Sequence, residues 1–250
     1  MHRTLDIIIP VYNEGENIGR TFDAIRAGIK TPHRITVVYD FEADNTLPVV
    51  RKLMKDGKLS GITLLRNKYG KGVLNAIKTG FEEAPGSVVL VMMADLSDDL
   101  ATVDSMFRKI NEGYDIVCGS RYMKGGAQIG GPLLKKTLSR LAGVSLHYLA
   151  GIPTHDITNS YKMYTKKVLS DIRIESAGGF EIGMEIVVKA FLKGYRIGEV
   201  PSVWRDRTAG ESRFLLKKWL PKYMRWYMLA ISGSFKKRLG IKGPGALRAR

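Results

Sequence analysis

The chain lacks most features that mark secreted or disulfide-stabilised proteins. Its single cysteine, Cys118, has no partner within the chain for a disulfide. The segment from Met1 to Val11 has neither the length nor the cleavage pattern of a signal peptide. These two absences favour a reducing compartment, and we expect the protein to be cytoplasmic.

Long apolar runs are also missing. The most apolar part of the C-terminal region is interrupted by Lys222 and Arg225, so it falls short of the roughly 20 apolar residues that a bilayer core requires. The chain contains no internal repeat and no low-complexity linker. At 250 residues it is long enough for one large α/β domain, alone or with a helical tail.

Acidic residues are scarce relative to basic ones. The chain has 24 Asp and Glu against 40 Lys and Arg, which gives a formal net charge of +16 and implies an acidic partner. Thirteen basic residues and only two acidic ones fall between Arg205 and Arg250, which favours a docking surface over a uniformly basic coat. Because no nucleic-acid-binding motif accompanies this charge, we do not expect nucleic acid as the partner.

Apolar runs alternate with segments of helical spacing through the first half of the chain. The uncharged run that begins at Ser87 suits a strand buried on both faces of a parallel sheet. The alternation predicts a mostly parallel sheet flanked by helices. The predicted strands span 4–11, 34–39, 62–65, 87–94, 115–118 and 195–204, and the predicted helices span 47–55, 73–83, 102–112, 133–149 and 180–192, with an earlier helix ending near 28. Four glycines between 125 and 131 predict a mobile loop.

The run that begins at Ser87 ends on Asp95, which Ser97, Asp98 and Asp99 follow. Because the carboxyl ends of parallel strands line the ligand crevice, these residues are placed to hold a cation beside a phosphorylated substrate. A polar junction between a strand and a loop is the alternative interpretation.

Apolar and aromatic residues recur at helical spacing near the C-terminus, with basic residues on the opposite face. The apolar set is Leu216, Trp219, Leu220, Tyr223, Trp226, Tyr227, Ala230 and Ile231. A basic amphipathic helix of this kind suits a membrane interface, with Trp219 and Trp226 inserted. The alternative is a helix packed on the domain with its charges in water.

Five short motifs occur along the chain between Leu5 and Phe214. They are Pro10-Val11-Tyr12-Asn13-Glu14, a strand ending at Asp40, Ala94-Asp95-Leu96, Gly119-Ser120-Arg121-Tyr122, and the run DRTAGES at 206–212. Together they resemble family 2 glycosyltransferases, in particular polyprenol-phosphate sugar transferases of the dolichol-phosphate mannose synthase type. The resemblance implies a GT-A fold, with a Rossmann-like sheet, over 1–214. The remaining 215–250 would form the basic membrane-interface tail.

The resemblance also implies a site for a nucleotide sugar linked to GDP or UDP. Its residues would be Pro10, Tyr12, Glu14, Asp40, Ala94, Asp95 and Glu185. Asp156 matches a second acidic position of the sugar pocket. The family's Asp-x-Asp metal motif is represented by Met93-Ala94-Asp95, so its first aspartate is missing.

The implied cofactor is a divalent cation, Mg²⁺ or Mn²⁺, held by Asp95 and Ser97. A thioether is a poor ligand for a hard cation, so Met93 does not replace a carboxylate. Three outcomes remain open: weaker binding by Asp95 with diphosphate and water, recruitment of Asp98 or Ser97, or loss of transferase activity.

On the acceptor side, the resemblance implies that the phosphate is bound by Arg121, Lys135, Ser139 and Arg207. Guanidinium groups can hold phosphate oxygens bidentately. The residues implied in catalysis are Asp95, Arg121 and Arg207, and the acceptor would be a dolichyl or undecaprenyl phosphate.

The sequence hypothesis is therefore an inverting glycosyltransferase, peripheral at the inner face of the membrane, that works on an anionic membrane surface. A small membrane-anchoring protein is a further partner that this hypothesis allows. Two alternatives stay open. One is transfer to a sugar hydroxyl in cell-surface polysaccharide synthesis, with Glu185 as the base, and the other is a non-catalytic GT-A scaffold protein.

Overall fold

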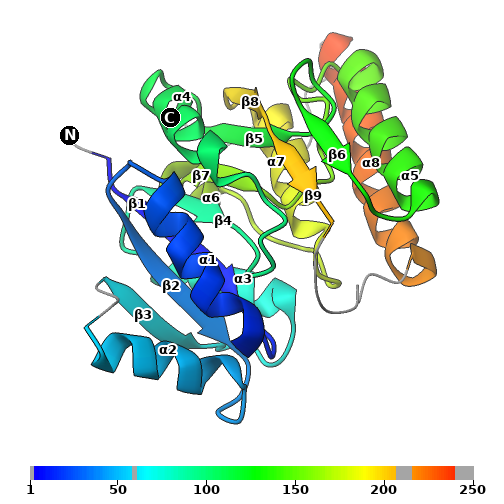
Figure 1. Ribbon diagram of the computed structural model, residues 1–250. Coiled ribbons are helices and arrows are strands. Elements are labelled where there is room, and N and C mark those ends of the chain that lie inside the picture. Colours follow the sequence, from blue (N-terminus) through cyan, green and yellow to red (C-terminus); the bar gives the residue numbers. More distant parts are fainter. Residues whose placement is uncertain (1–2, 58–60, 207–215, 240–250) are drawn as a thin grey trace.

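The computed structural model describes residues 3–57, 61–206 and 216–239. These ranges form a seven-stranded sheet in the order β3-β2-β1-β4-β7-β5-β8, in which β7 alone runs antiparallel to its neighbours. Figure 1 shows this sheet through the middle of the molecule. The strands are β1 (Leu5–Pro10), β2 (His33–Tyr39), β3 (Ile62–Arg66), β4 (Val88–Val91), β5 (Ile116–Ser120), β7 (Lys162–Thr165) and β8 (Ile197–Pro201). The predicted α/β fold class is confirmed.

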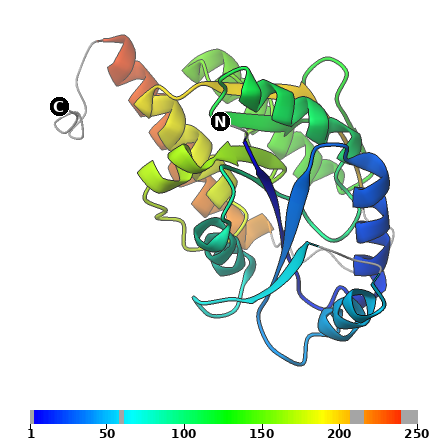
Figure 2. The ribbon, with the colours of Figure 1, turned by 90° about the vertical axis from the view of Figure 1, so that its left-hand side faces the viewer.

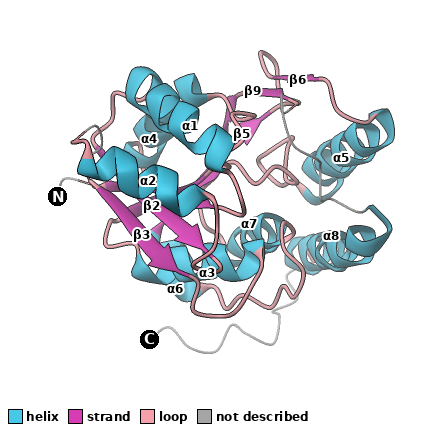
Figure 3. Ribbon diagram, turned by 60° about the horizontal axis from the view of Figure 1, so that its bottom comes forward, coloured by secondary structure: helices cyan, strands magenta, loops and turns pink. Residues whose placement is uncertain are grey.

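Helices cover both faces of the sheet, which explains why its central strands are mostly apolar. On β1, Ile7 and Ile9 pack in the core beneath one helix layer, while Ile8 packs in the core beneath the other. The first layer holds α1 (Gly15–Gly28), α2 (Thr46–Lys55) and α4 (Val103–Asn111), the last preceded by a 3₁₀ turn, η1 (Leu100–Thr102). The second layer holds α3 (Val73–Glu83), α6 (Lys166–Asp171) and α7 (Ile182–Lys193). Figure 3 shows the two layers on opposite sides of the strands.

The second half of the chain differs from its prediction at two strands. Strand β7 was not predicted, because its four residues begin with a charged side chain, Lys162, that is nevertheless buried. The predicted strand at 195–204 is two strands, β8 and β9 (Val203–Arg205). The glycine-rich segment predicted as a mobile loop contains β6 (Ala127–Ile129), which pairs with β9 in a separate two-stranded sheet.

Two long helices lie side by side at one end of the molecule (Figure 1). One is α5 (Leu133–Ser145), which continues into a π-helical turn, η2 (Leu146–Ala150), and the other is α8 (Leu216–Arg238). The hydroxyl groups of Ser145 and Tyr227 share a hydrogen bond of 2.9 Å between them. In Figure 2, α8 lies on the side of the sheet opposite α1 and α2.

The stripe predicted to enter a membrane is partly a packing surface. Trp226 is 2% exposed and Ala230 is fully buried, and both belong to the core beneath α7. Insertion of Trp226 into a membrane is therefore wrong, because its ring is already buried in the protein. The predicted boundary at residue 214 lies outside the described residues and stays a prediction.

Candidate functional site

A cavity of about 850 Å³ lies at the carboxyl edge of the sheet. Its walls include Pro10 at the end of β1, Asp40 after β2, and Met93, Ala94 and Asp95 after β4. Strand β2 lies on one side of β1, and β4 lies on the other. The order of the strands therefore reverses at β1, and such a reversal opens a crevice for ligands at the carboxyl ends of the strands.

The turn that follows β1 is anchored through its backbone. Asn13 adopts a φ of 56°, and its N–H donates to Oδ2 of Asp44 at 3.0 Å. The next N–H, of Glu14, donates to Oγ1 of Thr46 at 2.9 Å. This fixed turn presents Tyr12, 42% exposed, to the cavity. Its ring lies edge-on to that of Phe41, with 5.5 Å between the ring centroids.

Asp44 is a supporting residue that the sequence motifs did not reveal. Its side chain is fully buried, and Oδ1 accepts the N–H of Thr46 at 2.9 Å. An aspartate that bonds the backbone two residues later is a local turn signal, and that signal was available in the run Asp44-Asn45-Thr46.

Asp40 lines the cavity and also holds a neighbouring loop. Its two carboxylate oxygens accept hydrogen bonds from Nδ2 of Asn67 at 2.8 Å and from the N–H of Gly72 at 2.9 Å. Gly72 has a φ of 121°, which a glycine adopts readily. The adjacent Lys71 lines the cavity with its Nζ 5.3 Å from the ring centroid of Phe41.

Two carboxylates after β4 face the cavity together. Oδ1 of Asp95 accepts the N–H of Ser97 at 3.1 Å and its Oγ–H at 2.6 Å. Asp98 also lines the cavity, and the backbone N–H of Met93 lies 3.5 Å from its Oδ2. Burial and the nearby charge of Asp95 raise the pKa of Asp98 to about 7. A positive charge between the two side chains would relieve this repulsion.

These oxygen groups fit a hard divalent cation better than a soft one. In the described ranges no cluster of three or more His, Cys, Asp or Glu side chains is arranged to hold a metal. Asp95, Ser97 and Asp98 would therefore give only part of a coordination shell. Diphosphate oxygens and water would have to complete it.

Arg121 follows β5 and lines the cavity, and Asp156 holds its side chain in place from behind. Its Nε donates to Oδ2 of Asp156 at 2.6 Å, its Nη2 donates to Oδ1 at 2.9 Å, and its backbone N–H donates to Oδ2 at 3.0 Å. Burial acts to raise the pKa of Asp156, but the charge of Arg121 and the hydrogen bonds that it donates together lower this pKa. The guanidinium is thus held rigidly in its charged form.

Ser139 links this ion pair to α5. Its Oγ accepts a hydrogen bond from Nη2 of Arg121 at 3.0 Å and lies 2.5 Å from Oγ1 of Thr158. Lys135, one turn earlier on α5, also lines the cavity. The structure therefore brings three of the four predicted acceptor residues to the cavity, and Arg207 lies outside the described residues.

Glu185 does not line the cavity, so its predicted place in a sugar pocket is wrong. Its buried carboxylate accepts the N–H groups of Glu175 at 2.6 Å and Ser176 at 2.8 Å, and it pairs with Nζ of Lys189 at 2.6 Å. A neighbour on the same segment, Phe180, reaches the cavity instead.

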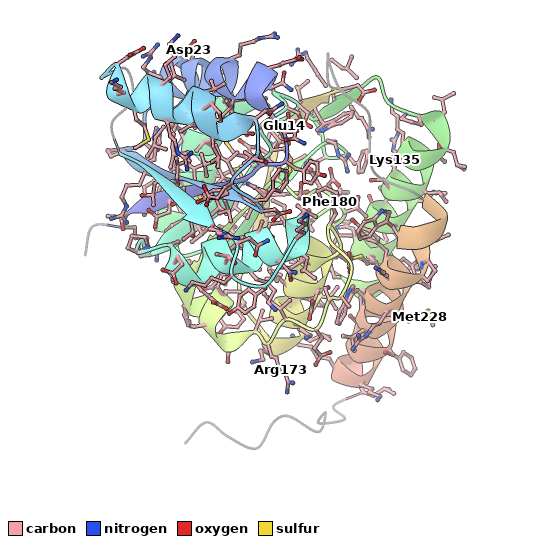
Figure 4. All side chains as sticks on the ribbon, turned by 90° about the horizontal axis from the view of Figure 1, so that it is seen from below. Glu14, Asp23, Lys135, Arg173, Phe180 and Met228 are labelled. Carbon is pink, nitrogen blue, oxygen red and sulfur yellow. The ribbon has the colours of Figure 1, made fainter. Side chains whose placement is uncertain are left out.

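Asp156 does not line the cavity either. It lies behind Arg121 as that residue's ion partner, and this corrects its predicted role at the sugar. Glu14, Lys135 and Phe180, labelled in Figure 4, come from three distant segments and lie in the same part of that view, whereas Asp23, Arg173 and Met228 lie at the periphery of the molecule.

The cavity extends between α5 and α8, where its walls become mostly apolar. The wall residues recur at intervals of three and four along each helix. They are Lys135, Leu138, Ser139 and Ala142 on α5, and Leu220, Tyr223, Met224 and Tyr227 on α8. The space thus runs from a charged end at Arg121 toward an apolar groove between two helices.

The outer surface of the same helices is also apolar. We call this surface the apolar face, and its exposed residues are Leu133, Leu134, Leu141, Tyr148, Leu149, Leu220, Met224, Met228, Phe235 and Leu239. Exposed apolar patches of this kind mark sites of interaction with proteins, membranes or ligands. Lys236, Lys237 and Arg238 adjoin it at the end of α8 and are exposed. Within the described ranges, no helix has both the length and the apolar character that a membrane crossing needs.

Comparison with known proteins identifies the family. The profile described as Glycosyl transferase family 2 matches residues 6–173. The chain belongs to glycosyl transferase family 2. A relative from Pyrococcus furiosus, named dolichol-phosphate mannosyltransferase, is 31% identical over 226 residues, which cover 88% of this chain and 62% of the relative. The chain thus spans less than two thirds of that relative's length.

A second relative of this family 2 chain is the polyprenol monophosphomannose synthase of Mycolicibacterium smegmatis. It is 30% identical over 217 residues, which cover 84% of this chain and 80% of the relative. Solved structures of glucosyl-3-phosphoglycerate synthase from Mycobacterium tuberculosis are similar in fold. One, with Mn²⁺, UDP and glucosyl-3-phosphoglycerate, gives a TM-score of 0.62 at 17% identity over 97% of this chain and 82% of that chain. Another structure of that synthase, with Mg²⁺ and UDP, gives a TM-score of 0.63 at 17% identity. The match covers 97% of this chain and 82% of that chain. The fold is GT-A.

Proposed function

We propose that this protein transfers a sugar from a nucleotide sugar to the phosphate group of a polyprenyl phosphate. One observation carries the proposal: a single cavity has Tyr12 and Asp40 at one end, Asp95 in the middle, and Arg121 at the start of an apolar groove. Those features suit a nucleotide, a diphosphate, a phosphate acceptor and a lipid chain in that order. The names of the two relatives supply the same acceptor class.

The proposed reaction is a single displacement that inverts the anomeric centre. A phosphate monoester is already anionic at neutral pH, so it attacks without a general base. The rigid guanidinium of Arg121, with Ser139 and Lys135 beside it, aligns the phosphate with the anomeric carbon. Arg207 is a further phosphate ligand in this proposal, on the strength of its motif.

A divalent cation, Mg²⁺ or Mn²⁺, belongs to the proposal. Asp95, Ser97 and Asp98 would hold it, with Asp98 in the role of the carboxylate that Met93 replaces. When bound, the cation stabilises the negative charge of the departing nucleoside diphosphate.

The apolar face supports peripheral binding to the cytoplasmic face of a membrane. Met228 and Phe235, 57% and 63% exposed, would enter the interfacial region, and Lys236 and Lys237 would contact anionic lipid headgroups. In this proposal these residues take the place of Trp226, which is buried, and of Trp219, which lines the cavity. The polyprenyl chain would then pass from the bilayer into the groove between α5 and α8.

The direct test supplies the enzyme with undecaprenyl or dolichyl phosphate in detergent and a panel of nucleotide sugars. Formation of a glycolipid together with a nucleoside diphosphate is the expected result, with undecaprenol, which lacks the phosphate, as an inactive control. Product formed only on a saccharide hydroxyl would instead support the polysaccharide alternative. No turnover with any donor would favour the scaffold alternative.

The cation site has its own test. We expect Asp98→Asn to weaken Mn²⁺ binding in the presence of UDP or GDP, read by electron paramagnetic resonance, about tenfold or more. Asp23→Asn, which removes an exposed carboxylate of α1, is the matched control and should bind Mn²⁺ normally. Equal Mn²⁺ affinity in the two variants would remove Asp98 from the site.

A further inference from the structure

A second, smaller hollow adjoins the cavity and has no role in the reaction proposed above. Its volume is about 10 Å³, which is the space of one water-sized group. It lies between α3, α7 and the sheet, its surface is almost entirely apolar, and its walls include Ile77, Phe81, Val91, Ile182 and Ile186. A hollow with such walls favours a small apolar group over water.

Ser160 and Phe180 border both the cavity and the hollow. Ser160 is half-buried, and its hydroxyl group forms no hydrogen bond to another described residue. The ring centroid of Phe180 lies 6.2 Å from that of Trp219, which also lines the cavity. The entrance of the hollow therefore offers one available hydroxyl group beside an aromatic ring.

Ser160 lies between the two charged parts of the site. The loop that carries it also carries Asp156, the ion partner of Arg121. On its other side, the antiparallel pairing of β7 with β4 places Ser160 beside the segment that leads from β4 to Asp95. In the proposed reaction, the sugar is linked to the diphosphate at Asp95 and attacked by the phosphate at Arg121. The hollow therefore opens at the place of the sugar.

The groups around this opening suit an apolar substituent better than a further hydroxyl group. The side chain of Asn159 already donates from Nδ2 to the carbonyl of Gly119 at 3.1 Å, and its Oδ1 accepts the N–H of Tyr161 at 3.4 Å. Met184 lines the cavity, whereas the carboxylate of Glu185 does not. A hydroxyl group in the apolar hollow would lose its hydrogen bonds to water, whereas a methyl group has none to lose.

We propose that the donor carries a 2-acetamido sugar, whose methyl group enters the hollow and whose amide group bonds the hydroxyl of Ser160. An amide has an N–H donor and a carbonyl acceptor, and a serine hydroxyl can accept from the first or donate to the second. The substituent at C2 is next to the anomeric carbon, so it lies close to the bond that breaks. The proposal rests on the proposed function, which fixes the place of the sugar, and it names the class of that sugar.

Isothermal titration with UDP-N-acetylglucosamine and UDP-glucose, each with Mn²⁺, measures the preference. The two donors differ only in the group at C2. We expect the acetamido donor to bind about tenfold more tightly, as for one buried methyl group and one added hydrogen bond. Ser160→Ala removes the hydroxyl group and should reduce this preference about fivefold.

Gly183→Ala narrows the hollow from its α7 side. An added Cβ would lie 3.6 Å from Nζ of Lys162 and 3.7 Å from Oη of Tyr164, which are ordinary contacts. The thermal midpoint should therefore be equal or higher, because alanine favours a helix more than glycine does. The preference for the acetamido donor should fall about tenfold.

Gly19→Ala is the matched control. Gly19 lies on α1, where an added Cβ would meet no described atom within 4 Å beyond its own helix and chain neighbours. This variant should keep the full preference. Saturation-transfer NMR of UDP-N-acetylglucosamine gives a second measurement, in which the acetyl methyl protons should receive the largest saturation in the wild type and less in Gly183→Ala.

Donor binding needs no acceptor, so this test is separate from that of the proposed function. If the acetamido donor is preferred as expected but no sugar reaches a polyprenyl phosphate, the acetamido subsite stands and the proposed function fails. The subsite is overturned by equal affinity of the wild type for the two donors, by no binding of either, or by a preference that Gly183→Ala and Gly19→Ala leave equally intact.

Discussion

In the donor half of the cavity, the functional side chains follow the ends of neighbouring parallel strands, whereas in the acceptor half they come from segments far apart in the sequence. Pro10, Asp40 and Asp95 follow β1, β2 and β4. Arg121 follows β5, and its partners Asp156 and Ser139 come from a loop and from α5.

The two halves also differ in how they hold charge. The donor half fixes its turns through backbone N–H groups, as at Asn13 and Gly72, and leaves side chains such as Tyr12 exposed to the cavity. The acceptor half buries a complete ion pair, Arg121 with Asp156. We infer that changes in the donor half alter activity with little effect on stability, while changes in the acceptor half alter both.

The largest effect should come from opening the acceptor ion pair. Asp156→Asn leaves the buried guanidinium of Arg121 without a compensating charge, so the free energy of unfolding should fall by about 3–5 kcal/mol. Urea unfolding followed by circular dichroism measures this. Asp40→Asn, the matched change in the donor half, should cost about 1 kcal/mol, the value of an ordinary hydrogen bond. Equal losses in the two variants would abolish the contrast.

The next effect is on rate rather than stability. Asp95→Asn keeps the hydrogen bonds from Ser97 but removes the charge that would hold the cation, so kcat should fall about 10²–10³-fold. The free energy of unfolding should change by less than about 1 kcal/mol. Steady-state kinetics and urea unfolding on the same preparation measure both. A large loss of stability in Asp95→Asn would show that the fold of the donor half also depends on the charge of this carboxylate.

A smaller effect is expected at the apolar face. Met228→Asp with Phe235→Asp should weaken binding to anionic vesicles at least about tenfold, because two side chains worth about 1.5–3 kcal/mol each would no longer be buried. Co-sedimentation with vesicles measures the partition. Met54→Asp, at an exposed apolar position of α2, is the control and should bind normally. Unchanged binding by the double variant would assign the apolar face to another partner.

The smallest effect is a pH dependence of stability in the acceptor half. The Arg121 charge lowers the pKa of Asp156 in the folded protein, so this carboxylate stabilises the fold above its unfolded pKa of about 3.9. That contribution is lost as the pH falls through the lower, folded pKa, with a slope of at most about 1.4 kcal/mol per pH unit. Below about pH 4, the free energy of unfolding of the wild type should fall with decreasing pH more steeply than that of Asp156→Asn, by this slope. Superimposable titrations would contradict the assignment.

The sequence predicted most of the donor half because its strands are buried on both faces. Uncharged runs therefore mark the strands, and the chemistry-bearing residues follow at once, as Asp95 does after β4. Helix α3, Val73–Glu83, was predicted at both ends. Asp44 was missed because the turn signal in the run Asp44-Asn45-Thr46 does not show that the carboxylate is buried beneath the site.

The acceptor half was predicted less well because the positions of its side chains depend on partners that are far away in the sequence. Strand β7 escaped because Lys162 breaks the apolar pattern, although the lysine is buried. Glu185 was misplaced because an acidic residue does not reveal its partner, here Lys189 and two backbone N–H groups. The helical spacing around Trp226 fits a core and a membrane equally well, and only the position of α7 decides between them.

In the proposed function, one cavity brings a nucleoside diphosphate and an acceptor phosphate together. Phosphorus NMR of phenyl phosphate, with the protein, Mn²⁺ and UDP or GDP present, tests it most directly, since a paramagnetic ion speeds relaxation only at short range. We expect a strong relaxation enhancement of the phenyl phosphate signal, and we expect Arg121→Gln to abolish it while the nucleotide stays bound. Normal relaxation of phenyl phosphate when both ligands are bound would contradict it.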